Sequence, residues 1–500
     1  MMAQGVHPRG RSLEDLLGPL LPGPWPGLEV SGLAQDSRRV RPGDLFLAVN
    51  GARGHGLAHW PEALRRGAVG VLWDPQGWAG PPPEGAWARP VPELRRHVGR
   101  IAARFYDDPS RRLRVVGVTG TDGKSSVSTF LAQAMHAQTA PFGVIGTLGA
   151  GFPGRMRATR HTTPDAIHLQ ALLAAFAQQR ARGVAMEVSS HALDQDRVAG
   201  VAFEVAVLTN ITRDHLDYHG DLERYARAKA RLFEMADLRH AVFNLDDPRG
   251  QSWARRLTGR LAVTGVAFGA PPALGIPCVG VEAEPLPGGL RLGLHWAGRR
   301  LGLDLPLLGR FNAQNAGLVF AVLLALGLDA DEAARRLQAL RPVPGRMEPF
   351  RAPGRPLAVV DYAHTPAALE QALRALRAHV SGRIFCVFGC GGSRDRGKRP
   401  LMGAVAERLA DRVILADDNP RDERPEAIVR EILAGTRHPE AVQVIHDRAQ
   451  AIATALELAG PGDAVLVAGK GHEGTQDFGA EVVRFSDREA VAALLHEVGP

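Results

Sequence analysis

Cysteine and lysine are scarce in this chain, and it has no long apolar run. The three cysteines cannot form a disulfide framework and show no CxxC spacing, so we expect neither a disulfide scaffold nor a zinc finger. No stretch approaches the ~18–20 apolar residues that cross a bilayer, which argues against membrane insertion. Prolines between residues 19 and 26 interrupt the only apolar run near the N-terminus, so no secretory signal is expected. The sequence therefore predicts a cytoplasmic protein.

The composition is typical of a folded protein with more than one domain. A length of 500 residues exceeds what one hydrophobic core usually organises, so we expect two or three domains. Hydrophobic residues make up 45% and charged residues 23%, which excludes a disordered chain. The net charge of +7 is scattered, without the aromatic interleaving of nucleic-acid surfaces. We expect a small anionic substrate and no nucleic acid.

Only four of the 60 Lys and Arg residues are lysines, and their positions form a pattern. Lys124, Lys398 and Lys470 lie in glycine-rich segments, and Lys229 follows a cluster of His and Asp residues. A drift toward arginine would leave a few lysines by chance. Arginine, however, cannot replace a compact ammonium at a phosphate and cannot be carbamylated like an amine. We therefore interpret the retained lysines as functional.

Strand-like runs alternate with glycine turns and helical patterns, which predicts an α/β fold. Near the N-terminus a polar turn at residues 41–44 precedes an alternating run, whereas the Pro- and Gly-rich residues 75–92 are expected to form a loop. Residues 114–118 then form a short apolar run that leads into a glycine turn and an amphipathic stretch at 125–136. Further strand-like runs occur at residues 183–188, 205–209 and 241–244.

A second doubly wound sheet is predicted toward the C-terminus. Residues 268–300 are rich in Pro and Gly and are expected to form hairpins or loops, and residues 342–346 (PVPGR) are a plausible linker. Helical periodicity separates these two segments. Buried-strand runs then alternate with helical patterns, at residues 357–360, 384–388, 413–416 and 464–467.

Residues 120–126 (GTDGKSS) follow a strand and begin a helix, where backbone N–H groups can bind phosphate oxygens. Lys124 can reach the β- and γ-phosphates of a nucleotide, and Ser125 can ligate Mg²⁺. The usual P-loop pattern has Gly five residues before Gly123, where this chain has Val118, so the loop is a shortened variant. On its own, this segment could also be an ordinary glycine turn.

Two more polar segments, residues 187–191 and 209–217, follow strands in the same domain. Glu187 and His215 could complete the coordination of magnesium that bridges ATP to a substrate. The alternative for His215 is a buried polar network without metal. Lys229 lies in a helical pattern, where a surface lysine is the default interpretation.

Four polar segments of the C-terminal half also follow strands, at residues 361–364, 389–399, 417–421 and 469–473. Open α/β sheets bind their ligands at this edge. Arg394 and Arg421 could grip carboxylates bidentately while Glu473 accepts an ammonium, which suits an amino acid. Each segment alone could be a solvated turn, but four on one edge favour a binding site.

These motifs, in this order, resemble those of the Mur ligases, most closely the members that add the third amino acid to the UDP-N-acetylmuramoyl dipeptide of peptidoglycan. The resemblance extends from residues 36–38 to 485–487 and is most specific in TGTDGKSS, HTTPDA, MEVSSHALDQDRV, TNITRDHLDYHG, NLDDP, DYAHTP, GCGGSRDRGKRP, DDNPR and GKGHE. It implies three domains: an N-terminal UDP-binding domain over residues 1–110, a central P-loop-type ATPase domain over 111–341, and a C-terminal Rossmann-like, amino-acid-binding domain over 342–500.

The resemblance also implies site residues. Catalytic roles fall to Lys124, Lys229 and His215. The ATP site would contain Gly120, Thr121, Asp122, Gly123, Lys124, Ser125, Ser126, Asn312, Arg346 and Asp361. The UDP-muramoyl peptide would contact Ser37, His161, Thr162, Thr163, Ser189, Gln195 and Arg197. The diamino acid would contact Arg394, Asp418, Asn419, Pro420, Arg421, Gly469 and Glu473. Mg²⁺ would be held by Ser125, Glu187, His215 and Lys229, the last as a carbamate (N6-carboxylysine).

The chain departs from the family pattern at a few positions. Asp122, Ser125 and Ser126 stand where the family usually has Asn-Thr-Thr, a change that keeps both hydroxyl groups. His161 replaces the usual Asn before Thr-Thr-Pro, and Ser393 replaces a usual Asp next to Arg394.

The activity implied is an ATP-dependent amide-bond ligase of cytoplasmic peptidoglycan precursor synthesis, acting as a monomer on UDP-N-acetylmuramoyl-dipeptide and a diamino acid through an acyl phosphate. Arg421 favours meso-diaminopimelate, which has a second carboxylate. Lysine or ornithine remains the alternative if Arg421 pairs instead with Asp418 or Glu423.

Three other functions would account for some of these features. A ligase similar to folylpolyglutamate synthetase shares the glycine loop but would not need the segment DSRRVRPGDLFLAVNG. A P-loop NTPase acting as a switch or motor would need neither the Arg/Glu site nor Lys229. A catalytically silent binding protein would not retain four lysines in this pattern.

Overall fold

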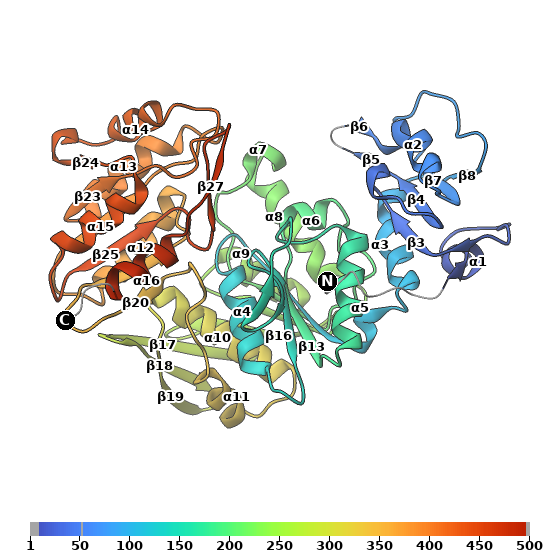
Figure 1. Ribbon diagram of the computed structural model, residues 1–500. Coiled ribbons are helices and arrows are strands. Elements are labelled where there is room, and N and C mark those ends of the chain that lie inside the picture. The colour runs from blue at the N-terminus through green and yellow to red at the C-terminus, as the bar shows by residue number, and fades with distance from the viewer. Residues whose placement is uncertain (1–9, 52–53, 497–500) are drawn as a thin grey trace. The chain divides into compact units, whose positions relative to one another are not determined.

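The computed structural model describes residues 10–51 and 54–496, and the chain divides into two compact units. The first unit contains the chain up to Val266 together with Pro271–Cys278 and Leu318–Leu328, and the second contains the remainder. Both units combine parallel sheets with helices, so the predicted α/β class is confirmed (Figure 1). None of the helices in these described ranges is long and apolar enough to span a membrane.

The N-terminal part of the first unit has a parallel four-stranded sheet in the order β3 (Gly32–Ala34), β4 (Asp44–Ala48), β7 (Gly70–Trp73) and β8 (Trp87–Pro90). The loop predicted at residues 75–92 is wrong at β8. Trp87 there packs edge-on against Trp25, with ring centroids 6.1 Å apart, and an edge strand tolerates Pro90. Around this sheet lie β1 (Arg11–Ser12), α1 (Leu13–Leu17), β2 (Glu29–Val30), β5 (Asn50–Gly51), β6 (Gly54–His55), α2 (Trp60–Arg65) and α3 (Leu94–Phe105).

The larger sheet of the first unit runs in the order β12, β11, β10, β13, β9, β14, β15 and β16. Its strands are β9 (Arg114–Thr119), β10 (Phe142–Gly146), β11 (Gly149–Phe152), β12 (Arg155–Arg157), β13 (Gly183–Glu187), β14 (Val205–Leu208), β15 (His240–Asn244) and β16 (Ala262–Phe268). From β10 to β16 neighbouring strands are parallel, and most of their residues are buried, as expected of strands covered on both faces.

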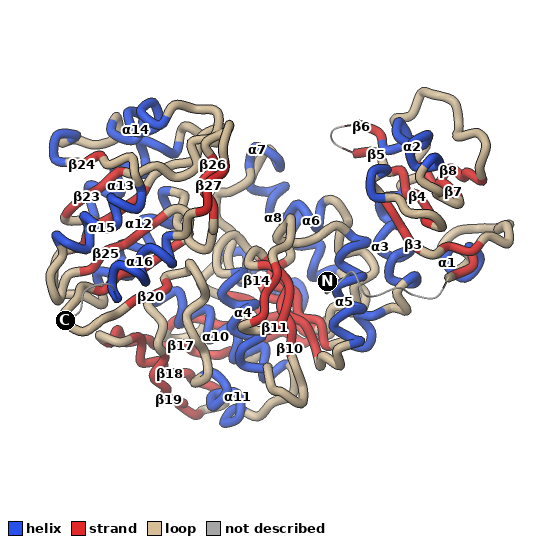
Figure 2. Tube along the Cα trace, viewed as in Figure 1, coloured by secondary structure: helices blue, strands red, loops and turns tan. Residues whose placement is uncertain are grey.

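Helices cover this sheet (Figure 2), and most of them begin at a residue whose side chain caps the first turn. Asp165 accepts a hydrogen bond from the backbone of His168 at the start of α5, and Asp221 accepts one from Arg224 at the start of α8. The helices are α4 (Lys124–Met135), α5 (Ala166–Gln178), α6 (Ser190–Asp194), α7 (Leu216–His219), α8 (Leu222–Ala230) and α9 (Pro248–Leu257).

The register of the parallel strands fixes which loops meet. Glu187 at the end of β13 pairs with Val118 of β9, and Leu208 at the end of β14 pairs with Thr119. The glycine loop after β9 therefore lies between the polar segments that follow β13 and β14.

The second unit begins with an antiparallel meander of β17 (Cys278–Leu286), β18 (Gly289–Trp296) and β19 (Arg299–Leu305), which confirms the hairpins predicted within residues 268–300. The helices α10 (Arg310–Ala325) and α11 (Ala330–Leu337) follow in sequence, and residues 318–325 of α10 belong to the first unit. Both match the helical periodicity of the sequence.

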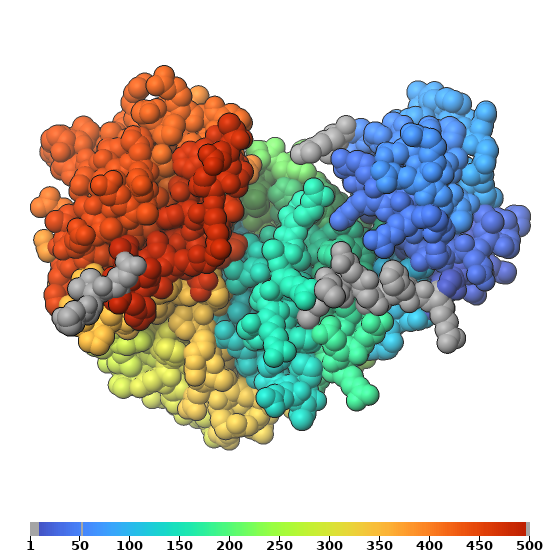
Figure 3. All heavy atoms as spheres, viewed as in Figure 1, coloured from blue at the N-terminus to red at the C-terminus, as the bar shows by residue number. Residues whose placement is uncertain are grey.

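The second sheet runs in the order β20 (Glu348–Phe350), β21 (Leu357–Asp361), β25 (Ala464–Ala468), β22 (Ile384–Phe388), β23 (Arg412–Leu415) and β24 (Gln443–Val444). One hydrophobic cluster joins it to α12 (Pro366–Arg377), α13 (Lys398–Leu409) and α14 (Pro425–Leu433), and another joins its other face to α15 (Arg448–Leu458) and α16 (Asp487–His496). This is the predicted doubly wound arrangement. Its atoms, coloured orange to red, form one closely packed body on the face that Figure 3 shows.

A buried ion pair braces the second sheet at the carboxyl end of β25. Arg448 and Asp487 are both fully buried and form two hydrogen bonds, of 2.7 and 2.9 Å. Arg448 also donates to the carbonyl of Ala468, at the end of β25, at 2.8 Å. Removing one member of such a pair typically costs about 3–5 kcal/mol, because the other charge stays buried. The hairpin of β26 (Thr475–Asp477) and β27 (Val482–Arg484) lies between β25 and α16 in the sequence.

Candidate active site

The glycine loop after β9 has a backbone that only glycine allows at two positions. Gly120 has φ +149° and Gly123 has φ +81°, and a Cβ on Gly120 would lie 1.8 Å from Oγ1 of Thr209. Lys124 begins α4, and its Nζ donates to the carbonyls of Gly120 and Thr121 at 3.0 and 2.7 Å. The loop therefore has the compact form that brings backbone N–H groups and an ammonium close to a phosphate.

Lys229 on α8 is buried beside this loop, so the default interpretation of a surface lysine is wrong. Its Nζ donates to the carbonyl of Gly120 at 2.7 Å and lies 4.5 Å from the ring centroid of Tyr225. Burial, reinforced by the charge of Lys124, lowers the pKa of Lys229 well below its ordinary value. A buried amine that favours its neutral form is a nucleophile.

Aromatic side chains close the space around Lys229. Tyr225 bonds Oγ1 of Thr121 at 3.1 Å, and burial raises its pKa. The rings of His191 and His215 lie 4.8 Å apart, and burial, with the charge of His215, lowers the pKa of His191 to about 4. His215 has φ +52° and lies 3.3 Å from the carboxylate of Asp214. Sequence reasoning missed Tyr225 and His191, because motif spacing does not reveal ring contacts between α6, α7 and α8.

Glu187 is held at the end of β13 by a residue that sequence reasoning did not select. Thr147 donates its backbone N–H to one oxygen of Glu187 at 2.8 Å and its hydroxyl to the other at 3.1 Å. The carboxylate is almost fully buried, and a Cβ on Gly146 would lie 2.2 Å from it. These contacts fix the orientation of a buried anion next to the glycine loop.

The donor set of this region suits magnesium. Within residues 10–51 and 54–496, no group of three or more His, Cys, Asp and Glu side chains is arranged to hold a metal. Mg²⁺, however, usually keeps several waters and needs only one or two carboxylates, so Glu187 and the hydroxyl of Ser125 match its preference for oxygen. The imidazole of His215 suits it less.

The residues expected to hold the muramoyl peptide form one hydrogen-bonded group. Thr163 donates to the carbonyl of Glu187 at 2.8 Å and accepts from the backbone of Ser189 at 3.1 Å. Arg197 donates to the carbonyl of Thr163 at 3.0 Å and to Oε1 of Gln195 at 2.6 Å. Thr162 meets Thr147 at 3.1 Å, and His161 is exposed.

Ser37, expected at the uridine end, lies in the N-terminal part of the first unit. Its hydroxyl donates to Oε2 of Glu62 at 2.6 Å, and the residue is buried. Asp36 caps the turn that contains it. Glu62 is thus a polar neighbour of this position that the motif did not include.

Three residues expected to contact the nucleotide lie in the second unit. Asn312 is buried and bonds the carbonyl of Leu308 at 2.9 Å. The guanidinium of Arg346 lies 4.4 Å from the ring centroid of Tyr362, and Asp361 accepts the backbone N–H of Met347 at 2.6 Å. Arg346, which precedes β20, therefore lies close to Asp361, the last residue of β21.

The ends of β23 and β25 form a second polar cluster around a fully buried amine, that of Lys470. Its Nζ donates to Oε2 of Glu473 at 3.0 Å and to Oδ1 of Asn419 at 3.1 Å. Asn419 in turn donates to the same Glu473 oxygen at 2.9 Å. Lys470 was recognised in the sequence as a retained lysine but was not included in the site. Its hydrogen bonds orient Asn419 and Glu473, two of the residues expected to bind the diamino acid.

Arg421 and Arg394 lie at the same edge of the sheet. Arg421 has φ +54° and is partly exposed; it donates to the carbonyl of Gly392 at 2.7 Å and lies 3.7 Å from the carboxylate of Asp477. The alternative pairing of Arg421 with Asp418 or Glu423 is therefore wrong. Arg394 is exposed and has no ion-pair partner among the described residues. The remaining residues expected to bind the diamino acid lie at the ends of β23 and β25: Asp418, Pro420 and Gly469.

Comparisons with known protein families cover most of the chain. The Mur ligase family, catalytic domain, matches residues 29–106, the Mur ligase middle domain matches 118–323, and the Mur ligase, glutamate ligase domain, matches 345–471.

Proteins of similar sequence from different bacteria share one name. UDP-N-acetylmuramoyl-L-alanyl-D-glutamate–2,6-diaminopimelate ligase of Alkalilimnicola ehrlichii is 52% identical over 476 residues, covering 94% of this chain and 95% of that protein. The protein of the same name from Pseudomonas aeruginosa is 46% identical over 482 residues, covering 96% and 98%.

Solved structures agree on the fold. A structure of a 2,6-diaminopimelate ligase of the same name has a TM-score of 0.71 at 34% identity, covering 98% of this chain and 99% of that chain. Mycobacterium tuberculosis folylpolyglutamate synthase, solved with ADP and AMPPCP, has a TM-score of 0.60 at 21% identity, covering 75% and 92%, which shows a shared fold alone.

Proposed function

Because the chain belongs to the Mur ligase family, we propose that it is an ATP-dependent ligase that joins a diamino acid to UDP-N-acetylmuramoyl-L-alanyl-D-glutamate. The observation that carries the proposal is the cluster at the ends of β22, β23 and β25. It combines the exposed Arg394 and partly exposed Arg421 with the oriented carboxylate of Glu473. Cations and an anion in this arrangement suit a zwitterionic amino acid.

The reaction forms one amide bond in two steps. The γ-carboxylate of the D-glutamyl residue attacks the γ-phosphorus of ATP, forming an acyl phosphate and releasing ADP. The amine of the diamino acid then attacks the acyl carbon, loses a proton and expels inorganic phosphate from a tetrahedral intermediate. Such a reaction depends on positioning and on neutralising phosphate charge.

The glycine loop of the first unit supplies this neutralisation. Residues 120–126 would present backbone N–H groups to the phosphates, and Lys124, whose Nζ lies over the carbonyls of the loop, would reach them. Ser125, Glu187, His215 and the carbamate of Lys229 would hold Mg²⁺, which would neutralise phosphate charge. Asn312, Arg346 and Asp361 are proposed to contact the nucleotide.

We assign a carbamate to Lys229. Its neutral amine attacks carbon dioxide, forming an N–C bond and releasing one proton, and the product is an anionic oxygen donor. Burial and the depressed pKa favour this chemistry, since a buried ammonium next to Lys124 would be repelled. Incorporation of isotopically labelled carbon dioxide, seen as a carbamate carbon resonance that Lys229→Met lacks, tests the assignment.

The muramoyl peptide is assigned to the first unit. Thr162, Thr163, Ser189, Gln195 and Arg197 form the hydrogen-bonded group at the end of β13, and His161 stands at its exposed margin. Ser37 is assigned to the uridine end. We propose three domains, at residues 1–110, 111–341 and 342–500, and each family match falls within one of them.

Meso-diaminopimelate is the diamino acid that the site favours. Arg421 is partly exposed and its ion pair with Asp477 is long, at 3.7 Å, so it can bind a distal carboxylate that lysine and ornithine lack. Several relatives are named for 2,6-diaminopimelate. We propose that the protein works as a cytoplasmic monomer.

One assay tests the function as a whole. Steady-state ADP release should require UDP-muramoyl dipeptide and a diamino acid together, with kcat/KM highest for meso-diaminopimelate among meso-diaminopimelate, lysine and ornithine. Multiple turnovers of ADP release without the amino acid would refute the ligase. A preference for lysine or ornithine would refute the assignment of Arg421.

A further inference from the structure

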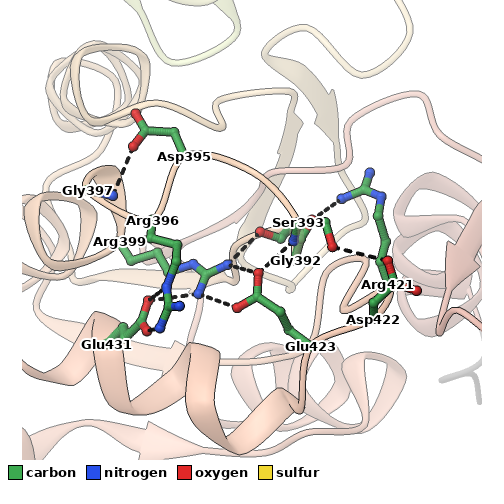
Figure 4. Close-up of polar contacts among 11 residues, drawn as sticks. Gly392, Ser393, Asp395, Arg396, Gly397, Arg399, Arg421, Asp422, Glu423 and Glu431 are labelled. Atoms are coloured by element: carbon green, nitrogen blue, oxygen red, sulfur yellow. Dashed lines mark hydrogen bonds and ion pairs between the residues drawn. The ribbon is translucent and has the colours of Figure 1, made fainter. Parts of the chain in front are cut away.

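A buried arginine, Arg399, lies outside the proposed amino-acid site and joins two segments of it (Figure 4). One segment carries Arg394, and the other carries Arg421. Arg399, in the first turn of α13, has a fully buried side chain. Its Nη1 and Nη2 bind the two oxygens of Glu423 at 2.8 and 2.9 Å, and Nη1 also donates to Glu431 at 2.7 Å. A buried cation is tolerated only when it is paired, and this one is held by two carboxylates.

Glu423 extends this contact to the turn next to Arg394. Its Oε1 accepts the backbone N–H of Ser393 at 2.6 Å, and Arg399 donates to the carbonyl of Gly391 at 3.1 Å. Ser393 has φ +53°, which a non-glycine residue adopts only when its surroundings hold it. Its hydroxyl also donates to Asp422 at 3.2 Å. The pair of Arg399 and Glu423 therefore fixes residues 391–393.

The same pair leaves Arg421 without a carboxylate from its own segment. Both oxygens of Glu423 face Arg399, while Arg421 donates to the carbonyl of Gly392 at 2.7 Å. Gly392 also donates its N–H to the carbonyl of Asn419 at 2.9 Å. The turn before Arg394 and the segment containing Arg421 are thus held as one piece.

We propose that the Arg399–Glu423 pair is a positioning element that sets affinity for the diamino acid. It fixes the turn that carries Arg394 against the segment of Arg421. Arg421 then faces only one carboxylate of the described chain, that of Asp477 at 3.7 Å, a long contact that a substrate carboxylate can replace. The inference rests on the proposed function, since it assigns the pair to the amino-acid subsite. Arg399 and Glu423 act through Arg394 and Arg421.

Glu431 provides a matched control. It binds the same buried guanidinium as Glu423, and its other partner is the exposed Arg396, but it makes no hydrogen bond to residues 391–393 within the described chain. Glu423→Ala should raise the KM for meso-diaminopimelate about tenfold or more, while the KM values for ATP and UDP-muramoyl dipeptide change less than about twofold. Glu431→Ala should leave all three within about twofold, even where it lowers the melting temperature.

Two results would overturn the inference: equal effects of Glu423→Ala and Glu431→Ala on the KM for meso-diaminopimelate, or a parallel rise of all three KM values. Should Glu423→Ala fail to fold, Glu423→Gln decides, because it keeps an acceptor for Ser393 and removes the charge that binds Arg399. An unchanged KM for the amino acid in that variant contradicts the inference. A wild-type protein that forms no amide refutes the proposed function instead, so the two failures are distinguishable.

Discussion

The amine of Lys229 lies 2.7 Å from the carbonyl oxygen of Gly120, in the turn that follows β9. The two residues are separated by more than a hundred positions in sequence, and the packing of α8 against the loop joins them. Burial lowers the pKa of this amine, and Lys124, over the same loop, lowers it further. A neutral nucleophile thus lies beside the proposed phosphate site.

Replacing this amine should nearly abolish turnover. Lys229→Met removes the group that we propose to be carbamylated, and small carboxylates such as acetate or formate should restore part of the activity by supplying an oxygen donor. Arg227→Met, which removes an exposed cation from the same helix, is the control and should remain close to wild type. Near-normal steady-state activity of Lys229→Met would contradict the role.

Lys124→Ala should remove the chemical step and spare binding of the UDP-muramoyl dipeptide. The lost charge neutralisation should cost about 3 kcal/mol of transition-state stabilisation, or roughly a hundredfold or more in kcat. Calorimetric titration of the variant with UDP-muramoyl dipeptide checks the second half of the prediction. A comparable collapse of that affinity would show that Lys124 serves the peptide site.

Arg421→Ala should narrow the preference for meso-diaminopimelate over lysine. Loss of a bidentate partner for the distal carboxylate should lower kcat/KM for meso-diaminopimelate about tenfold or more and change that for lysine much less. Arg424→Ala is a suitable control, because Arg424 is largely exposed on the same segment and pairs only loosely with Glu426, at 3.6 Å. Equal losses for both amino acids would contradict a role for Arg421 in selectivity.

The pair of Arg399 and Glu423 should also affect stability at acidic pH. Arg399 lowers the pKa of Glu423 from 4.5 to about 2 in the folded protein. A carboxylate whose folded pKa is depressed stabilises the fold above its unfolded pKa, and this contribution is lost as pH falls toward the folded value. The difference in melting temperature between wild type and Glu423→Gln should therefore be constant above about pH 5 and shrink between about pH 4.5 and 2. A difference that stays constant over that lower range would contradict the pairing.

The positions of the motifs in the fold could be predicted because parallel strands have a simple signature. Apolar runs followed by glycine-rich polar segments placed Gly120, Glu187 and the four C-terminal segments at strand ends, and the structure confirms this. The strand β8 was not predicted, because the many Pro and Gly residues around Trp87 indicated a loop and the strand itself is short and lies at the edge of its sheet.

The contacts within the site could not be predicted to the same degree. Thr147 orients Glu187 from a loop 40 residues away, and Lys470 orients Asn419 from a different strand end. Spacing along the chain does not encode such pairings, because they depend on strand order and on which side chains become buried. Two sequence signals indicated Lys470: the scarcity of lysine and its position in the polar segment at residues 469–473.

The central claim is that amide formation proceeds through an acyl phosphate, and the fate of the carboxylate oxygen tests it most directly. UDP-muramoyl dipeptide carrying heavy oxygen in the γ-carboxylate of its glutamyl residue is incubated with ATP, Mg²⁺ and meso-diaminopimelate. The inorganic phosphate released is then analysed by mass spectrometry. We predict one labelled oxygen in phosphate for each amide formed, and none when the amino acid is omitted. Unlabelled phosphate accompanying amide formation would contradict the account.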